Sequence, residues 1–322
     1  MPSYVTHNKS YFEIYKTLPT EIQKRYEEHW SKYNIFAMGH DTAYAYAAMT
    51  VLMHFHKLPT LLKELKIIQD KDIQDLTINY INAMQNPKAE TKLFLYGYLM
   101  HHFLDAKLHP LIVYETGDFL NSLTCEADHL LLERMIDSYL LKQVGINPQK
   151  FKVHRLVTSK MALTEETRSV INKSFNLTYQ INDFDRVFAE YNKHTRAFLR
   201  ATHYDPYGIK KILFKPLDIA LKGRFKPSYW THTHDGTEAI PYLNLANEKW
   251  EHPVEGNGFS YASFEDLYSD GIKEISQMIK NLDMAIIDQA TENELRDIIP
   301  NISSSYGLPP SDNIKITNNR KK

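Results

Sequence analysis

The chain contains a single cysteine, Cys125, among 322 residues, so no disulfide can form within it. This fits a reducing compartment. No apolar run reaches the roughly 18 residues that a membrane-spanning helix needs. The first residues lack a basic stretch followed by an apolar one, so no signal peptide is expected. The net charge of −1 argues against a general nucleic-acid-binding or anionic-membrane surface. Together these absences predict a cytoplasmic protein with no transmembrane segment and no strong nucleic-acid signature.

Glycine is also scarce, with 11 residues, whereas hydrophobic residues make up 43% of the chain. Long runs with a period of about 3.6 residues, together with few glycines, are typical of helices. We therefore expect an all-α fold with one multi-helix domain over residues 1–300. The polar stretch that follows, residues 301–322, reads as a disordered tail.

The strongest feature is an apolar helix expected over Lys92–Tyr114 with polar side chains set into it. His101, Asp105 and His109 follow one another at four-residue steps, a spacing that places side chains on one helical face. Gly97, one turn earlier, leaves room on that face. A buried carboxylate between imidazoles is costly unless something compensates its charge, and a zinc ion would do so. Pro110 predicts that the helix kinks or ends near His109, which would aim this imidazole at a different metal.

A second His-x-x-x-Glu pair, His129 and Glu133, lies on another expected helix, His129–Gln143. Asp137 shares its face, either as an acceptor for a ligand's N–H or as a solvent-facing residue. With 15 histidines and 39 acidic residues, about two such pairs arise by chance, and three occur. Hydrogen-bonded core histidines therefore remain the alternative to a metal site.

Further candidate ligands lie earlier in the chain, at His7, Asp41 and His54. His7 alone reads equally well as a surface histidine, and His56 competes with His54 because both cannot share one helical face. The dipeptide His40-Asp41 reads either as polar loop residues or as the HD pair of another class of metal phosphohydrolase. The histidines of the loop His232–His234 are expected to be solvated, with a role at the substrate as the alternative.

The segments that carry these residues, MPSYVTH, FAMGHD, FLYGYLMHHFLDAKLHP and DHLLLERMID, resemble the bacterial zinc-dependent phospholipase C family. That family is related in fold to single-strand-specific zinc nucleases. The resemblance implies an all-α fold, two or three zinc ions and phosphodiester hydrolysis. The family's aspartate turn usually reads Gly-Pro-Asp, whereas this chain has Gly39-His40-Asp41.

The resemblance also implies a role for each candidate ligand. Asp105 would bridge two zinc ions, and Asp41 would be a ligand that also serves as a general base. The residues implied as metal ligands are His7, Asp41, His54, His101, Asp105, His109, His129 and Glu133.

The function expected from the sequence is therefore a zinc-dependent phosphodiester hydrolase in which a metal-bound hydroxide attacks phosphorus in line. Its substrate would be a phosphodiester such as a phospholipid head group. One alternative is a metal-dependent nuclease or nucleotide phosphohydrolase, although no basic stripe is visible in the sequence. The other is a non-catalytic metal-binding or scaffold protein.

Overall fold

The computed structural model describes residues 4–42, 72–85, 87–119, 122–157, 163–185, 196–197, 199–220, 226–231, 235–311 and 314–317. Over these residues the predicted all-α fold is confirmed, with one short antiparallel pair of strands. The α-helices are α1 (Tyr4–Thr17), α2 (Thr20–Trp30), α5 (Ile73–Ala83), α6 (Ala89–Thr116), α7 (Leu123–Gln143), α8 (Glu165–Tyr179), α10 (Ile209–Ala220), α11 (Phe264–Ile287) and α12 (Glu292–Ile298). The 3₁₀ turns are η1 (Asn34–Met38), η3 (Pro148–Lys150), η4 (Val153–Arg155), η5 (Pro227–Trp230) and η6 (Ile240–Tyr242), and the strands are β1 (Trp250–Glu251) and β2 (Phe259–Ser260).

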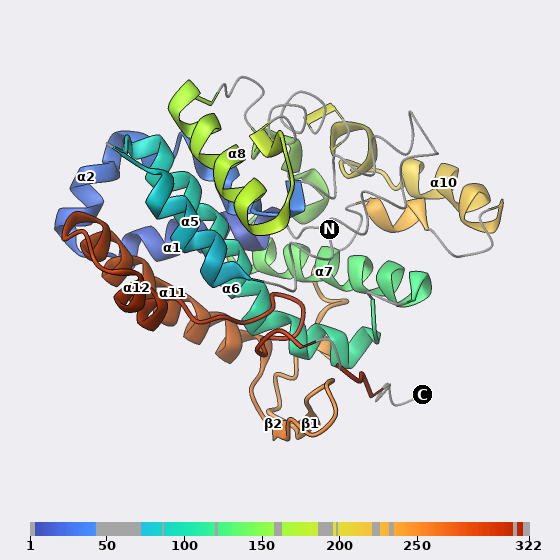
Figure 1. Cartoon of the computed structure of the whole chain (residues 1–322). Coiled ribbons are helices and arrows are strands. Elements are labelled where there is room, and N and C mark those ends of the chain that lie inside the picture. The colour runs from blue at the N-terminus through green and yellow to red at the C-terminus, as the bar shows by residue number, and fades with distance from the viewer. Residues whose placement is uncertain are drawn as a thin grey trace.

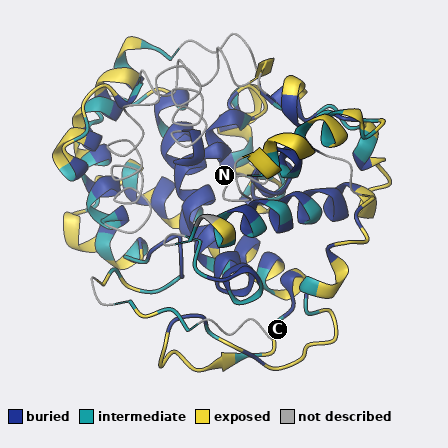
Figure 2. Ribbon diagram, turned by 90° about the vertical axis from the view of Figure 1, so that its right-hand side faces the viewer, coloured by how far each residue is buried: buried dark blue, intermediate teal, exposed yellow. Residues whose placement is uncertain are grey.

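Helix α6 runs through the middle of the molecule, with α1, α2, α7, α8, α11 and η1 packed around it (Figure 1). Its residues are buried on nearly every side, and the centre of the molecule in Figure 2 is accordingly dark blue. A helix that is apolar all round is expected to lie inside a protein. The histidines and Asp105 of α6 are therefore held away from water.

Pro110 does not end this helix, because α6 continues to Thr116. Proline has no N–H, so it leaves the carbonyl of Ala106 without its usual helical partner. Gly307 lies against that carbonyl, and a Cβ there would be 2.3 Å from the oxygen of Ala106. Gly307 also has a φ of +69°, so two constraints favour glycine at this position.

The segment after α12 corrects the expectation of a disordered tail over residues 301–322. Ser303, Ser304, Ser305 and Tyr306 are all buried, and we call residues 301–308 the C-terminal strap. Two imidazoles of α6 contact its backbone carbonyls, which are hydrogen-bond acceptors that composition does not reveal. Further on, Ile316 forms a bridge with Val254, and residues 318–322 lie outside the described part.

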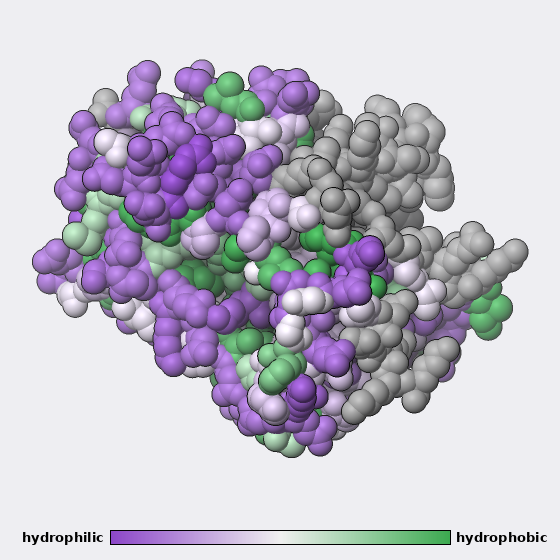
Figure 3. Space-filling model, turned by 60° about the horizontal axis from the view of Figure 1, so that its bottom comes forward, coloured by the Kyte–Doolittle hydropathy of each residue, from purple (hydrophilic) through white to green (hydrophobic). Residues whose placement is uncertain are grey.

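The face of the molecule drawn in Figure 3 is largely hydrophilic, with apolar residues in hollows near its middle and others at its edges. Within the described residues, no helix combines the length and hydropathy that crossing a membrane requires.

Candidate metal centre

The first of two buried clusters joins His7, Asp41, His101 and Asp105. These residues come from α1, from the turn after η1 and from α6. The Nε2 atom of His101 lies 3.4 Å from Asp41 Oδ2 and 3.1 Å from Asp105 Oδ2. On the other side, His7 Nε2 lies 3.1 Å from Asp105 Oδ1. Two imidazoles and two carboxylates thus converge on one small volume.

The second cluster joins His109 of α6 with His129 and Glu133 of α7. Glu133 Oε1 lies 3.2 Å from His129 Nε2 and 3.8 Å from His109 Nε2. Burial would raise the pKa of Glu133, but His129 and His109 outweigh it and hold that pKa well below its usual range. Burial lowers the pKa of His129, so this imidazole is neutral at pH 7. A charged carboxylate beside a neutral imidazole is the state in which both act as metal ligands.

Asp105 stands between the two clusters. Its Oδ1 atom faces His7 and also lies 3.8 Å from His109 Nε2, while Oδ2 faces His101. Burial would raise the pKa of Asp105, yet His101, His109 and His7 together hold it well below the usual value. The carboxylate is therefore charged, with Oδ1 available on the side of His7 and His109 and Oδ2 on the side of His101, as a bridging ligand needs.

The tight packing of η1 on α6 fixes the ring of His101. Gly97 lets the backbone of Phe36 approach, because a Cβ on Gly97 would lie 2.7 Å from the Phe36 carbonyl carbon. His101 Nδ1 lies 2.9 Å from the carbonyl oxygen of Ala37. A carbonyl can only accept, so Nδ1 carries the hydrogen, and Nε2 is left to face the carboxylates. The room predicted beside Gly97 is thus occupied by η1.

His109 is oriented in the same way by the C-terminal strap. Its Nδ1 atom donates to the carbonyl oxygen of Ser304 over 2.7 Å, which leaves Nε2 facing Glu133 and Asp105. A hydrogen bond from the far ring nitrogen to a carbonyl is the usual support for a metal-binding imidazole. The segment expected to be a tail therefore helps to hold the second cluster in place.

Asp137 supports the first cluster from α7 and is not solvent-facing. It is fully buried, and its carboxylate accepts hydrogen bonds from the backbone N–H groups of Val5 and Thr6 and from Thr6 Oγ1. These bonds satisfy orphan N–H groups in the first turn of α1. They fix the start of the helix that carries His7, so the predicted bond from Asp137 to a ligand's ring N–H is replaced by bonds to backbone.

Burial and neighbouring charge also distinguish the imidazoles of the first cluster. Burial alone would lower the pKa of His101, but Asp105 and Asp41 outweigh it and raise that pKa to about 9. Burial and the neighbouring His101 lower the pKa of His7. Without a cation, His101 is therefore protonated at pH 7, and a bound metal would have to displace that proton.

His40 lies at this site, although the sequence argument did not place it among the expected metal ligands. It is completely buried, with Nε2 at 3.8 Å from Asp105 Oδ2 and 3.9 Å from Asp41 Oδ1. Neither of its ring nitrogens has a hydrogen-bond partner among the described residues. The available signal was its position in the aspartate turn, where the resembled family has proline. Gly39, with a φ of +45°, bends this turn against the ring of His101.

Two unpaired atoms, one in each cluster, are consistent with a metal ion. Within the described part of the chain, His101 Nε2 and Glu133 Oε2 are buried and make no hydrogen bond. Orphaned polar atoms in a protein interior are rare and call for an explanation such as an ion. All the donors are imidazole nitrogens or carboxylate oxygens, which zinc accepts. The two groups could therefore hold metal ions.

The outcome for the predicted ligands is therefore plain. The structure gathers seven of the eight, namely His7, Asp41, His101, Asp105, His109, His129 and Glu133. His54 and its rival His56 lie outside the described residues, as do His232 and His234.

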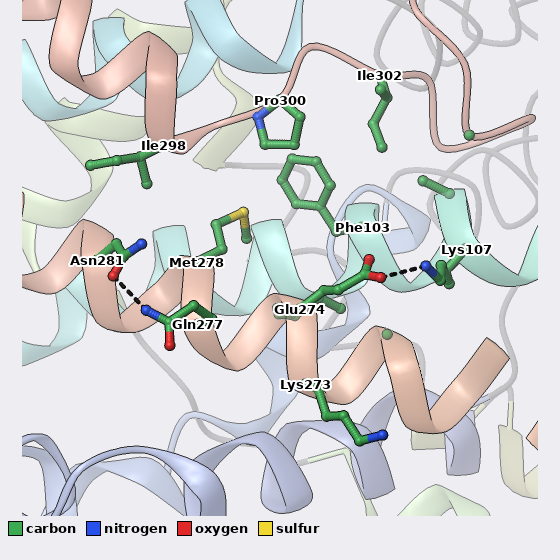
Figure 4. Close-up of a pocket in the computed structure, with 14 residues that line it drawn as sticks. Phe103, Lys107, Lys273, Glu274, Gln277, Met278, Asn281, Ile298, Pro300 and Ile302 are labelled. Atoms are coloured by element: carbon green, nitrogen blue, oxygen red, sulfur yellow. Dashed lines mark hydrogen bonds and ion pairs between the residues drawn. The ribbon is translucent and has the colours of Figure 1, made fainter. Parts of the chain in front are cut away.

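The opposite side of α6 borders a separate cavity of about 720 Å³, shown in Figure 4. Phe103 and Lys107 contribute to its wall together with α11 and residues from the end of α12 and the C-terminal strap. Lys107 and Glu274 form an ion pair of 2.6 Å at one end. None of the lining residues is a candidate ligand, so this cavity is not the metal centre.

No family model, curated protein or solved structure matches this chain.

Proposed function

We propose that this protein is a zinc-dependent phosphodiester hydrolase of the phospholipase C type. One observation carries the proposal: Asp105 places Oδ1 at 3.1 Å from His7 and Oδ2 at 3.1 Å from His101, and Oδ1 also lies 3.8 Å from His109 of the second cluster. Metal ions that share a carboxylate suit phosphodiester chemistry, because paired cations stabilise both the attacking and the leaving oxygen. The motifs that resemble the zinc-dependent phospholipase C family contain these same residues.

The two clusters would hold the ions through imidazole Nε2 atoms and carboxylate oxygens. When bound, zinc supplies a Lewis acid and lowers the pKa of a coordinated water toward 7. The carbonyls of Ala37 and Ser304 keep the ligand rings of His101 and His109 in one orientation. Preorganised ligands need no rearrangement during the reaction, and this lowers the barrier.

Asp41 has two roles in this proposal. Its Oδ2 atom faces His101 and serves as a ligand, while Oδ1 faces His40 and is the atom that would accept the proton of the attacking water. Both oxygens lie in the first cluster, so the base and the ions are within reach of one phosphate group. A base placed there meets the geometric requirement for general base catalysis.

The test is metal removal followed by measured restoration. The purified protein is stripped with a chelator, and zinc is then added back while hydrolysis of a soluble phosphodiester, a phosphatidylcholine emulsion and a single-stranded oligonucleotide is followed. We expect activity on the first two substrates to return in step with bound zinc. Activity confined to the oligonucleotide would replace the phospholipase C assignment with that of a nuclease.

Asp41→Asn provides the residue-level test, with Asp270→Asn as its control. Asp270 is an exposed aspartate of α11 that pairs only with Lys273 in the described structure. Asp41→Asn should reduce kcat by a factor of 10² or more, because a positioned base contributes about that much. The control variant should retain full activity. Equal rates in the two variants would exclude Asp41 from the reaction.

A second candidate is a non-catalytic metal protein, and burial favours it. Every one of the seven gathered ligands is at most 5% exposed. Structural metal sites are closed, whereas catalytic sites keep a position open for water or substrate. Stoichiometric zinc that raises the thermal midpoint, with no turnover on any of the three substrates, would establish this second function.

A further inference from the structure

Helix α10 is amphipathic, but its apolar face points to the solvent and its polar face points to the protein. Its apolar residues Ile209, Ile212, Leu213, Leu217 and Ile219 are between 48% and 79% exposed, and no residue of the helix is buried. At about 100° per residue they occupy one continuous arc about 160° wide. Such an arc normally faces the core.

The polar side of α10 is the one that is attached to the protein. Asp218 accepts hydrogen bonds from the backbone N–H and the Oγ of Ser228 in η5, at 3.1 and 2.5 Å. The backbone N–H of Lys211 donates to Asp205 Oδ2 over 2.8 Å, and Lys210 Nζ donates to the carbonyl of Arg200 over 2.6 Å. These bonds hold the helix with its apolar arc outward, at the edge of the molecule (Figure 1).

We propose that α10 is a membrane-docking helix that lies in the head-group region of an anionic lipid bilayer. Exposing an apolar arc about three turns long to water is unfavourable, and a bilayer interface would cover it. A helix with a strong apolar face and lysines on its other side is typical of interfacial membrane binding. This inference does not depend on the proposed hydrolase activity.

The distribution of charge favours an anionic lipid surface as the partner. Lys215 is exposed at one border of the arc, and Lys211 is half-exposed next to it. The single carboxylate of α10, Asp218, is turned to η5 and bound to Ser228. The outward face therefore carries positive charge at its border and no negative charge. Lysines near a membrane surface attract anionic lipids.

The experiment measures co-sedimentation of the whole protein with vesicles of phosphatidylcholine alone or mixed equally with phosphatidylserine. The wild type should bind the mixed vesicles more tightly. Leu213→Ser should weaken binding about tenfold, since one inserted leucine side chain is worth about that much. Leu177→Ser is the matched control, because Leu177 of α8 is 59% exposed but lies on a different helix. It should bind like the wild type.

A second pair of variants tests the charge. Lys215→Gln should weaken binding to the mixed vesicles about fivefold and leave binding to phosphatidylcholine unchanged. Lys273→Gln changes an exposed lysine of α11 and should alter binding to neither vesicle.

Failure of the wild type to bind either vesicle, or equal losses in Leu213→Ser and Leu177→Ser, would overturn the proposal. A wild-type dimer in light scattering that Leu213→Ser converts to a monomer would also overturn it, by showing that a second copy covers the arc. Zinc content and hydrolysis of a soluble phosphodiester, measured on the same samples, separate this result from the hydrolase test.

Discussion

The two ligand clusters differ in how far apart in the sequence their members lie. The second draws on α6 and α7, which follow one another, and two of its three members are the local pair His129 and Glu133. The first needs α1, the turn after η1 and α6 to pack correctly before any ion can be held. A site assembled from distant segments depends on the whole fold, while a site on two consecutive helices depends mainly on their own contact.

This difference extends to the supports of each cluster. The first relies on Asp137, a residue of α7 that fixes the start of α1 through backbone bonds. The second relies on the C-terminal strap through Ser304. Asp105 lies within reach of both clusters. Variants of Asp105 and of its neighbours therefore test whether the two clusters bind metal together or independently.

The largest effect is expected from Asp105→Asn, which removes the charge that both clusters share. We expect the loss of more than one equivalent of metal per chain, because a bridging ligand serves two ions. Elemental analysis of the purified variant after dialysis measures this. Asp270→Asn serves again as the exposed control. Metal content equal to that of the wild type would show that Asp105 does not bridge.

Glu133→Gln should remove about one equivalent and leave the first cluster loaded. The amide keeps the shape of the side chain but lacks the negative charge that faces His129 and His109. Elemental analysis again gives the count, and a competition titration with a chelator gives the affinity of the remaining ions. If the variant lost all of its metal, the two clusters would have to be regarded as one cooperative site.

The pH dependence of stability provides a third contrast. The pKa of His101 in the metal-free fold is raised to about 9 from 6.5, whereas burial lowers that of His129. A raised folded-state pKa gives stability that is present below pH 6.5 and is lost as the pH rises through 9. The metal-free protein should thus lose on the order of 3 kcal/mol across that window.

Urea unfolding at several pH values measures this loss. The zinc-loaded protein should show little of it, because the cation takes the place of the proton. If the free energy of unfolding fell equally with pH above 6.5 in the metal-free and the zinc-loaded protein, no ion would reach His101.

The sequence predicted the helices, through the spacing of apolar residues, and the local ligand pairs, through the spacing of histidines and carboxylates. The helical fold and the face shared by His101 and Asp105 follow from spacing on one helix. His129 and Glu133 follow from the same rule. What spacing could not supply is the convergence of α1 and η1 on α6, because close backbone contacts such as that of Gly97 with Phe36 decide it.

One expectation failed for a clear physical reason. The strap was taken for a disordered tail because serine-rich composition is polar, whereas its carbonyls are the acceptors that His102 and His109 require. Composition sums over residues, while partners are recognised by local faces.

The smallest effect is expected at His40, which lies beside the first cluster and not the second. His40 and His102 are both buried imidazoles. His102 Nε2 bonds to the carbonyl of Ile302 over 2.7 Å, whereas His40 makes no hydrogen bond in the described structure. If His40 Nε2 contributes to the first cluster, His40→Phe should lower the affinity of that cluster about tenfold, the lower end of what supporting groups of metal sites contribute. The visible spectrum of the cobalt-substituted protein should change as well, because an imidazole near the ion alters its ligand field.

His102→Phe is the matched control, and it should lower the free energy of unfolding by about 1 kcal/mol through the lost hydrogen bond without changing the spectrum. Identical spectra in wild type and His40→Phe would show that this imidazole only fills space beside Asp41 and Asp105.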